Sequence, residues 1–128
     1  MYLTLLFVLM MLTGCQFTQT AFSKTTSNAG AAFSAAATTF EYAHQGKLTI
    51  AYARASFVSF KSQLSGLDQQ LPSQQGAPDT HSVQHLLQLY QVAMQVVKQP
   101  CWSASCNWHT QLAALQQASQ AFTKAGNA

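Results

Sequence analysis

The sequence predicts an all-α protein, a small three- or four-helix bundle with a long first helix and one disulfide in the last interhelical loop. Apolar residues recur at heptad spacing from residue 29 onward, and residues 29–124 contain no strand-like alternation of useful length. Stretches that contain Gly and Pro separate the periodic segments. With 128 residues, the chain has room for one domain of this kind.

The composition is poor in charge. Charged residues make up 7% of the chain, against about 25% in an average soluble domain, so Gln, Ser and Thr are expected to supply most of the polar surface. The net charge of +3 comes from six basic and three acidic residues spread along the whole length. Binding to nucleic acid depends on dense Lys and Arg clusters that neutralise phosphates. We therefore expect no nucleic-acid partner.

The first element, residues 1–14, has the pattern of a secretory signal. Leu3 to Leu12 form a ten-residue apolar run, LTLLFVLMML, whereas a helix that spans a bilayer needs about 20 residues. The run has the length of the apolar region of a signal peptide, and the small residues Thr13 and Gly14 follow it before Cys15. This order of residues predicts cleavage and export.

The stretch Leu12-Thr13-Gly14-Cys15 resembles the lipobox of bacterial lipoproteins. The resemblance covers residues 1–15 only. It implies that the Cys15 thiol carries acyl chains, that residues 1–14 are removed, and that the protein is anchored in the bacterial cell envelope outside the cytoplasm. Residues 15–27 are then the lipidated cysteine and a flexible tether rich in Ser and Thr. The alternative is a buried N-terminal helix with a free cysteine.

The bundle domain is expected over residues 28–128, and its first helix over residues 28–67. One apolar position recurs every seven residues, at Ala29, Ala36, Ala43, Ile50, Phe57, Leu64 and Leu71. Because the heptad phase continues through Gly46, one long helix is favoured. The alternative is that Gly46 ends one helix at its C′ position and Lys47 begins another.

Two further helices follow a loop over residues 66–79, which carries two prolines and two glycines. Asp79 or Thr80 can cap the next helix, which Pro100 stops. The last helix is expected from about Cys106 to Lys124. Its apolar face contains Trp108, Leu112, Leu115, Ser119 and Phe122.

Cys101 and Cys106 lie in the segment between the last two helices. Outside the cytoplasm, two cysteines this close in a turn are expected to form a disulfide. Trp102 and Trp108 flank the pair. They either cover the disulfide and close the end of the bundle, which is the favoured interpretation, or form a surface that contacts a partner.

His81 and His85 are spaced to lie on one helical face, where they could hold a metal ion together with His109. The favoured interpretation leaves both histidines on a solvated first turn, with no metal or other cofactor. A disulfide would also remove Cys101 and Cys106 as metal ligands. A metal-binding helical bundle is therefore the alternative function.

No catalytic motif was found. The three carboxylates are Glu41, Asp68 and Asp79, and they form no paired motif; neither G-x-S-x-G nor a Gly-rich phosphate loop occurs. We therefore expect a non-enzymatic binding or structural module. Its expected partners are the membrane, through acyl chains on Cys15, and another protein or cell-envelope component.

Overall fold

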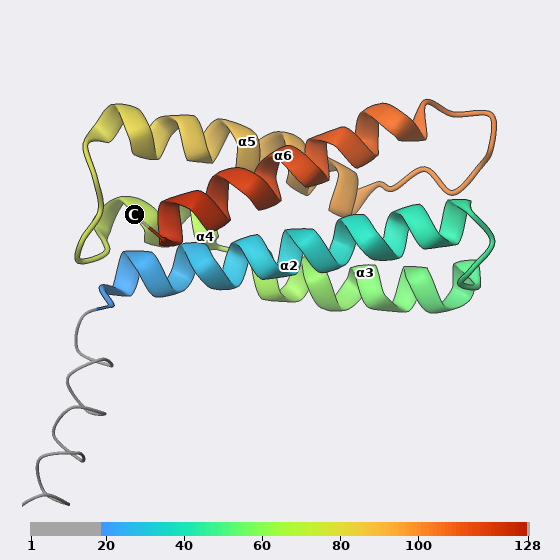
Figure 1. Ribbon diagram of the computed structural model, residues 1–128, viewed down its shortest axis with the longest axis horizontal. Helices are drawn as coiled ribbons and strands as arrows, with labels where there is room; N and C mark the ends of the chain where they lie inside the picture. The colour runs from blue at the N-terminus through green and yellow to red at the C-terminus, as the bar shows by residue number, and fades with distance from the viewer. Residues whose placement is uncertain (1–18, 128) are drawn as a thin grey trace, which may run out of the picture.

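The computed structural model describes residues 19–127, which form a bundle of four long helices (Figure 1). The long helices are α2 (Ala21–His44), α3 (Ile50–Leu64), α5 (Thr80–Lys98) and α6 (Trp108–Gly126). The short helix α4 (Leu67–Gln70) and the 3₁₀ helix η1 (Leu71–Ser73) connect α3 to α5. No β-strand occurs among the residues described. The all-α prediction is confirmed, in its four-helix form.

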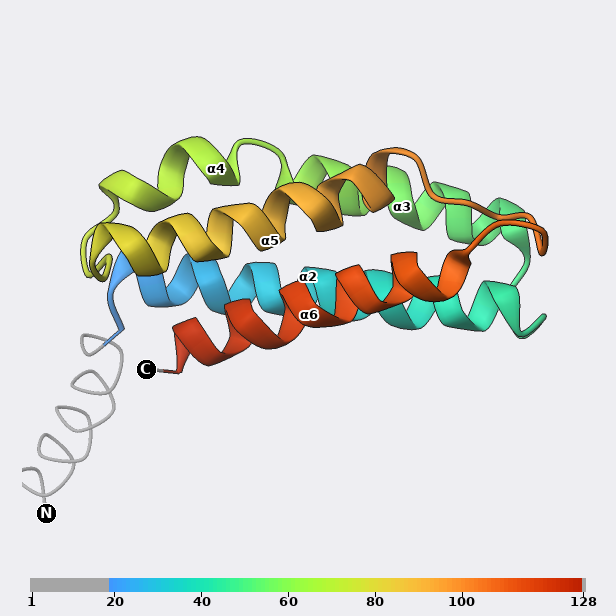
Figure 2. The same ribbon diagram turned by 90° about the horizontal axis from the view of Figure 1, so that it is seen from above.

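Each long helix lies beside two others. Figures 1 and 2 together place α2 and α5 at opposite corners of the bundle, with α3 and α6 between them. The closest pair is α2 and α6, which touch through glycines. A Cβ atom added to Gly30 would lie 2.8 Å from the backbone nitrogen of Thr123. A Cβ atom added to Gly126 would lie 2.9 Å from the backbone nitrogen of Ser27. The absence of these two side chains lets the backbones approach.

Helix α2 begins seven residues earlier than the expected start at residue 28. Thr20 is its N-cap, and the Thr20 hydroxyl accepts a hydrogen bond of 3.1 Å from the backbone N–H of Ser23. Phe22 and Thr26 are buried, and the Thr26 hydroxyl donates to the carbonyl of Phe22 at 2.8 Å. The prediction of a flexible tether over 15–27 is therefore wrong for residues 21–27, because these residues form the start of α2 and bury Phe22 and Thr26 in the bundle.

The prediction of one continuous helix over 28–67 is also wrong. Helix α2 ends at His44, Gly46 adopts a φ of 76°, and the chain reverses before α3 begins at Ile50. The Thr49 hydroxyl caps α3 by accepting from the backbone N–H of Tyr52 at 3.2 Å. Gly46 thus occupies the C′ position of the alternative, and the reversal uses residues 45–49 rather than a shorter turn.

The expected loop over residues 66–79 is partly helical. Leu67 and Leu71 lie on α4 and η1 and are buried, which anchors this connection to the core. Asp79 then caps α5 as predicted, because its carboxylate accepts from the backbone N–H of Ser82 at 3.2 Å. The connection is therefore a packed part of the fold.

Aromatic rings fill the centre of the bundle. Phe33, Phe40 and Phe122 are fully buried. The Phe33 ring lies 5.7 Å from that of Phe122, and the Phe40 ring lies 6.0 Å from that of Phe57, between ring centroids. Because burial of a large apolar side chain contributes about 1.5 to 3 kcal/mol, these rings are a main source of stability. The core extends to both ends of the bundle, where Trp102 and Trp108 pack against it at one end and Phe22 belongs to it at the other.

Candidate functional site

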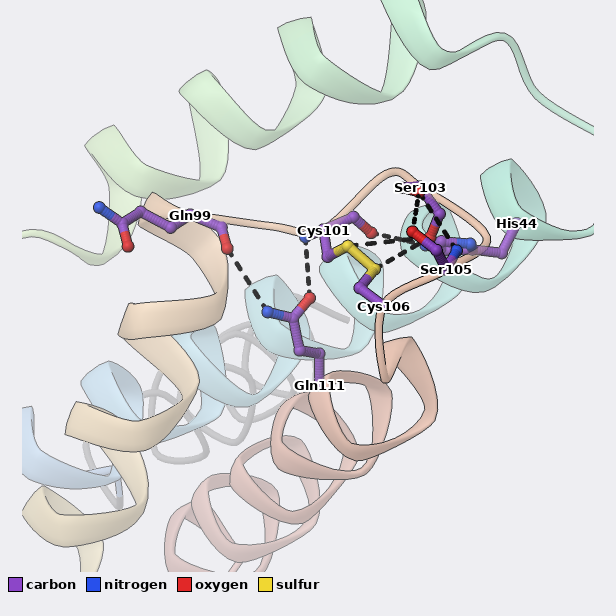
Figure 3. The surroundings of a disulfide bond; sticks show 7 residues. All are labelled: His44, Gln99, Cys101, Ser103, Ser105, Cys106 and Gln111. Carbon is purple, nitrogen blue, oxygen red and sulfur yellow. Dashed lines mark hydrogen bonds between the residues drawn. A yellow bond between two sulfur atoms is a disulfide. The ribbon is translucent and has the colours of Figure 1, made fainter.

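The loop between α5 and α6 contains the predicted disulfide, Cys101–Cys106, with the two Cα atoms 6.4 Å apart. Figure 3 shows how the neighbouring side chains hold it. The backbone N–H of Cys101 donates to the side-chain oxygen of Gln111 at 2.9 Å, and the Gln111 amide group donates to the carbonyl of Gln99 at 3.4 Å. A side chain from the first turn of α6 thus bridges the start of the loop to the end of α5.

His44 connects this loop to the end of α2. Its Nε2 lies 2.8 Å from the carbonyl oxygen of Cys101, and because a carbonyl can only accept, Nε2 carries the hydrogen and donates it. The imidazole also stacks on Trp108, with 4.3 Å between ring centroids and 4° between the planes. His44 was not among the residues predicted from the sequence to form a site. Its position four residues after Phe40, on the same helical face, was the available signal.

Trp102 and Trp108 close this end of the core. The Trp102 ring lies 5.0 Å from Phe57 and 5.5 Å from Phe40, and the Trp108 ring lies 6.3 Å from Phe40. Both indoles are half-buried. The favoured interpretation of the tryptophans as a cover over the bundle end is confirmed.

The three histidines proposed as metal ligands do not come together. His81 and His85 lie exposed near the start of α5, whereas His109 lies at the start of α6, beside Trp108, with 3.8 Å between ring centroids. The length of α5, about 28 Å, separates these two bundle ends. Cys101 and Cys106 are joined to each other. Within residues 19–127, no cluster of three or more His, Cys, Asp or Glu could hold a metal ion.

His81 and His85 instead line a groove between α5 and α6, at the end of the bundle where α2 begins. The groove has a volume of about 980 Å³. Its apolar lining consists of Phe22, Pro78, Leu86, Leu89, Ala121 and Ala125. Its polar lining consists mainly of His81, Ser82, His85, Gln117, Gln120 and Lys124. Ligand sites typically have this size and this mixture of apolar and polar groups.

The shape of the groove follows from small residues on α6. Ala121 and Ala125 line it one turn apart, and their side chains end at Cβ, so they leave space beside α5. On α5, His81, His85 and Leu89 are spaced four residues apart and therefore share one face. The two histidines are recognisable in the sequence as candidate site residues, but the groove is not, because it exists only where the two helices meet.

The groove contains one cationic side chain, Lys124, two histidines and no acidic side chain. Lys124 and the two histidines are exposed along it, and none of its lining residues is Asp or Glu. The nearest carboxylate along the chain, Asp79, is engaged in capping α5. It accepts from the Ser82 hydroxyl at 2.7 Å, and the hydrogen bonds from Ser82 lower the pKa of Asp79.

Cys15, the predicted lipidation site, and residues 1–14, the predicted signal peptide, lie outside the residues described. Among the helices of residues 19–127, none has the length and apolar character required to span a membrane.

Comparison with known proteins found no matching family model, no similar curated protein and no similar solved structure.

Proposed function

We propose that this protein is a lipid-anchored helical module of the bacterial cell envelope, exposed outside the cytoplasm, that serves a binding or structural role. The observation that carries the proposal is the order of residues 3–15, in which an apolar run, two small residues and Cys15 follow one another. Two or more acyl chains on one cysteine give stable membrane attachment, whereas a single chain gives only reversible binding.

The disulfide supports this location. Disulfides persist in oxidising compartments, while cytosolic thiols are kept reduced. The Cys101–Cys106 bond holds the loop that carries Trp102, and Trp102 packs on the core residues Phe40 and Phe57. A disulfide that holds a packed loop in place is typical of proteins outside the cytoplasm.

The early start of α2 defines how the bundle would be attached. Only residues 16–20 separate Cys15 from Ala21, the first residue of α2. Five residues span at most about 18 Å. The bundle would therefore stay close to the membrane surface, with the end that contains the start of α2 directed toward it.

Metabolic labelling tests the proposal. The full chain is produced in a bacterium fed an alkyne-bearing palmitate analogue, and the protein is extracted from membranes for intact-mass measurement. We expect a labelled species that begins at acylated Cys15 and gains two hydrogens on reduction. The Cys15→Ala variant should lose the label, and the matched variant Cys106→Ala should keep it. An unprocessed chain that begins at Met1, or label retained in Cys15→Ala, would contradict lipidation.

A further inference from the structure

The groove between α5 and α6 combines three properties. It is elongated, because the residues that line it on α5 extend from His81 to Leu89, about 12 Å along the helix. Leu89, Ala121 and Ala125 are half-buried, so apolar surface within it remains in contact with water. Its charged and titratable lining groups are Lys124, His81 and His85.

These properties indicate the chemistry of an occupant. A linear apolar chain along the helices would remove the exposed parts of Leu89, Ala121 and Ala125 from water. A negative head group would lie beside the Lys124 ammonium and the two imidazoles, and none of the lining residues is acidic. The Asp79 carboxylate accepts a hydrogen bond from Ser82 at 2.7 Å, so we expect the head group at Lys124 rather than at Ser82. A cationic or uncharged head group would gain less from the same surroundings.

We propose that this groove binds a medium-chain fatty acid in its carboxylate form, with the acyl chain between α5 and α6 and the carboxylate beside Lys124. The inference does not depend on lipidation of Cys15, because it is carried by the lining of the groove. Binding requires no covalent step. Gln117 and Gln120 supply further hydrogen-bond donors in the lining.

Photocrosslinking of the full chain in native membranes tests the proposal. The probe is dodecanoic acid with a diazirine in its chain and an alkyne tag, and the labelled residues are mapped by mass spectrometry. We expect labelling concentrated on residues 81–89 and 117–125. Excess untagged dodecanoate should compete with the probe. The corresponding probe with an alcohol in place of the carboxyl should label these segments about tenfold less, because the charge-assisted contact is lost.

Two pairs of variants separate the groove from the rest of the surface. Ala121→Leu fills the groove and should reduce labelling about tenfold, since each displaced methylene is worth about fourfold in affinity. Its control is Ala113→Leu, on α6 but outside the groove lining. Lys124→Gln should reduce carboxylate labelling, whereas Lys98→Gln, also in the last turn of its helix but outside the groove, should not. Circular dichroism of each purified variant verifies the fold.

Several results would overturn the proposal. One is labelling spread over the whole surface, and another is labelling that a correctly folded Ala121→Leu variant retains. Equal labelling by the alcohol probe would overturn the role of the carboxylate. Another is weak labelling of the native chain together with stronger labelling of the Cys15→Ala variant, which would show that the protein's own acyl chain occupies the groove instead.

Discussion

The close contact between α2 and α6 leads to a prediction whose sign depends on the tertiary structure. Gly30 lies inside α2, where replacement by Ala would favour an isolated helix by about 0.8 to 1.0 kcal/mol. In the bundle, the new Cβ would lie 2.8 Å from the Thr123 nitrogen and would also run into the Thr123 side chain. Ordinary contact begins at 3.4 Å, so the helices must separate locally by about 0.6 Å.

This separation has two costs. The Ser119 hydroxyl donates to the Gly30 carbonyl at 3.0 Å, and separation of the helices would weaken this bond, which is worth about 1 kcal/mol. Overpacking of a close contact costs about 1 to 3 kcal/mol in addition. After the gain in helix propensity is subtracted, we expect Gly30→Ala to lower the free energy of unfolding by about 1 to 3 kcal/mol.

Urea unfolding followed by circular dichroism measures this change, and an unchanged dependence on urea concentration shows that only stability has shifted. The control is Ala35→Gly, at an exposed position of the same helix, which reports helix propensity alone and should cost about 1 kcal/mol. Stabilisation by Gly30→Ala of about the size that Ala35→Gly costs would show that the α2–α6 contact imposes no steric penalty on a side chain at residue 30.

Three further predictions concern the ties between elements. Replacement of both Cys101 and Cys106 by Ser should lower the free energy of unfolding by about 2 kcal/mol, from loop-closure entropy at a separation of five residues; equal urea midpoints with and without the disulfide would contradict this. His44→Phe keeps a ring against Trp108 but loses the hydrogen bond to the Cys101 carbonyl. We expect it to lower the free energy of unfolding by about 1 to 2 kcal/mol and to change the tryptophan emission; an unchanged urea midpoint would show that the bond does not stabilise the fold. Tyr90 donates to the Leu64 carbonyl at 2.6 Å, and burial, followed by repulsion from Asp68, raises the pKa of Tyr90 above its ordinary 10.0. Because the Tyr90 hydroxyl ionises at lower pH in the unfolded chain than in the folded one, the stability that neutral Tyr90 contributes should be complete below pH 10 and be lost as the pH rises from there through the raised pKa. A Tyr90→Phe variant whose stability falls in the same way at alkaline pH would contradict this.

Local sequence patterns determined most of the helical content. The apolar stripe and the Asp79 cap predicted α5, and the spacing of Trp108, Leu115 and Phe122 predicted α6 to within about two residues at each end. These signals act within one or two turns, so they can be recognised without knowledge of the fold. The disulfide was predicted for a related reason, because its two cysteines are close in sequence.

The break in the first predicted helix shows where such patterns fail. The heptad phase continues across Gly46 although the chain reverses there, and Ile50, a member of the apolar series, is 42% exposed. Two successive amphipathic helices can keep a common phase by chance, because periodicity records which face is apolar and not the direction of the chain. The cap at Thr49 was the local signal for a new helix.

The helical class, the approximate helices and the bonded cysteine pair can be read from local patterns, since these features depend on neighbours along the chain. The packing of the helices is what places His44 against Trp108 and His109 far from His81 and His85. It also leaves a groove between the alanines of α6 and helix α5. The physical reason is that such contacts depend on the distance and facing of separate helices. Side-chain packing sets that geometry over the whole bundle, and no single segment encodes it.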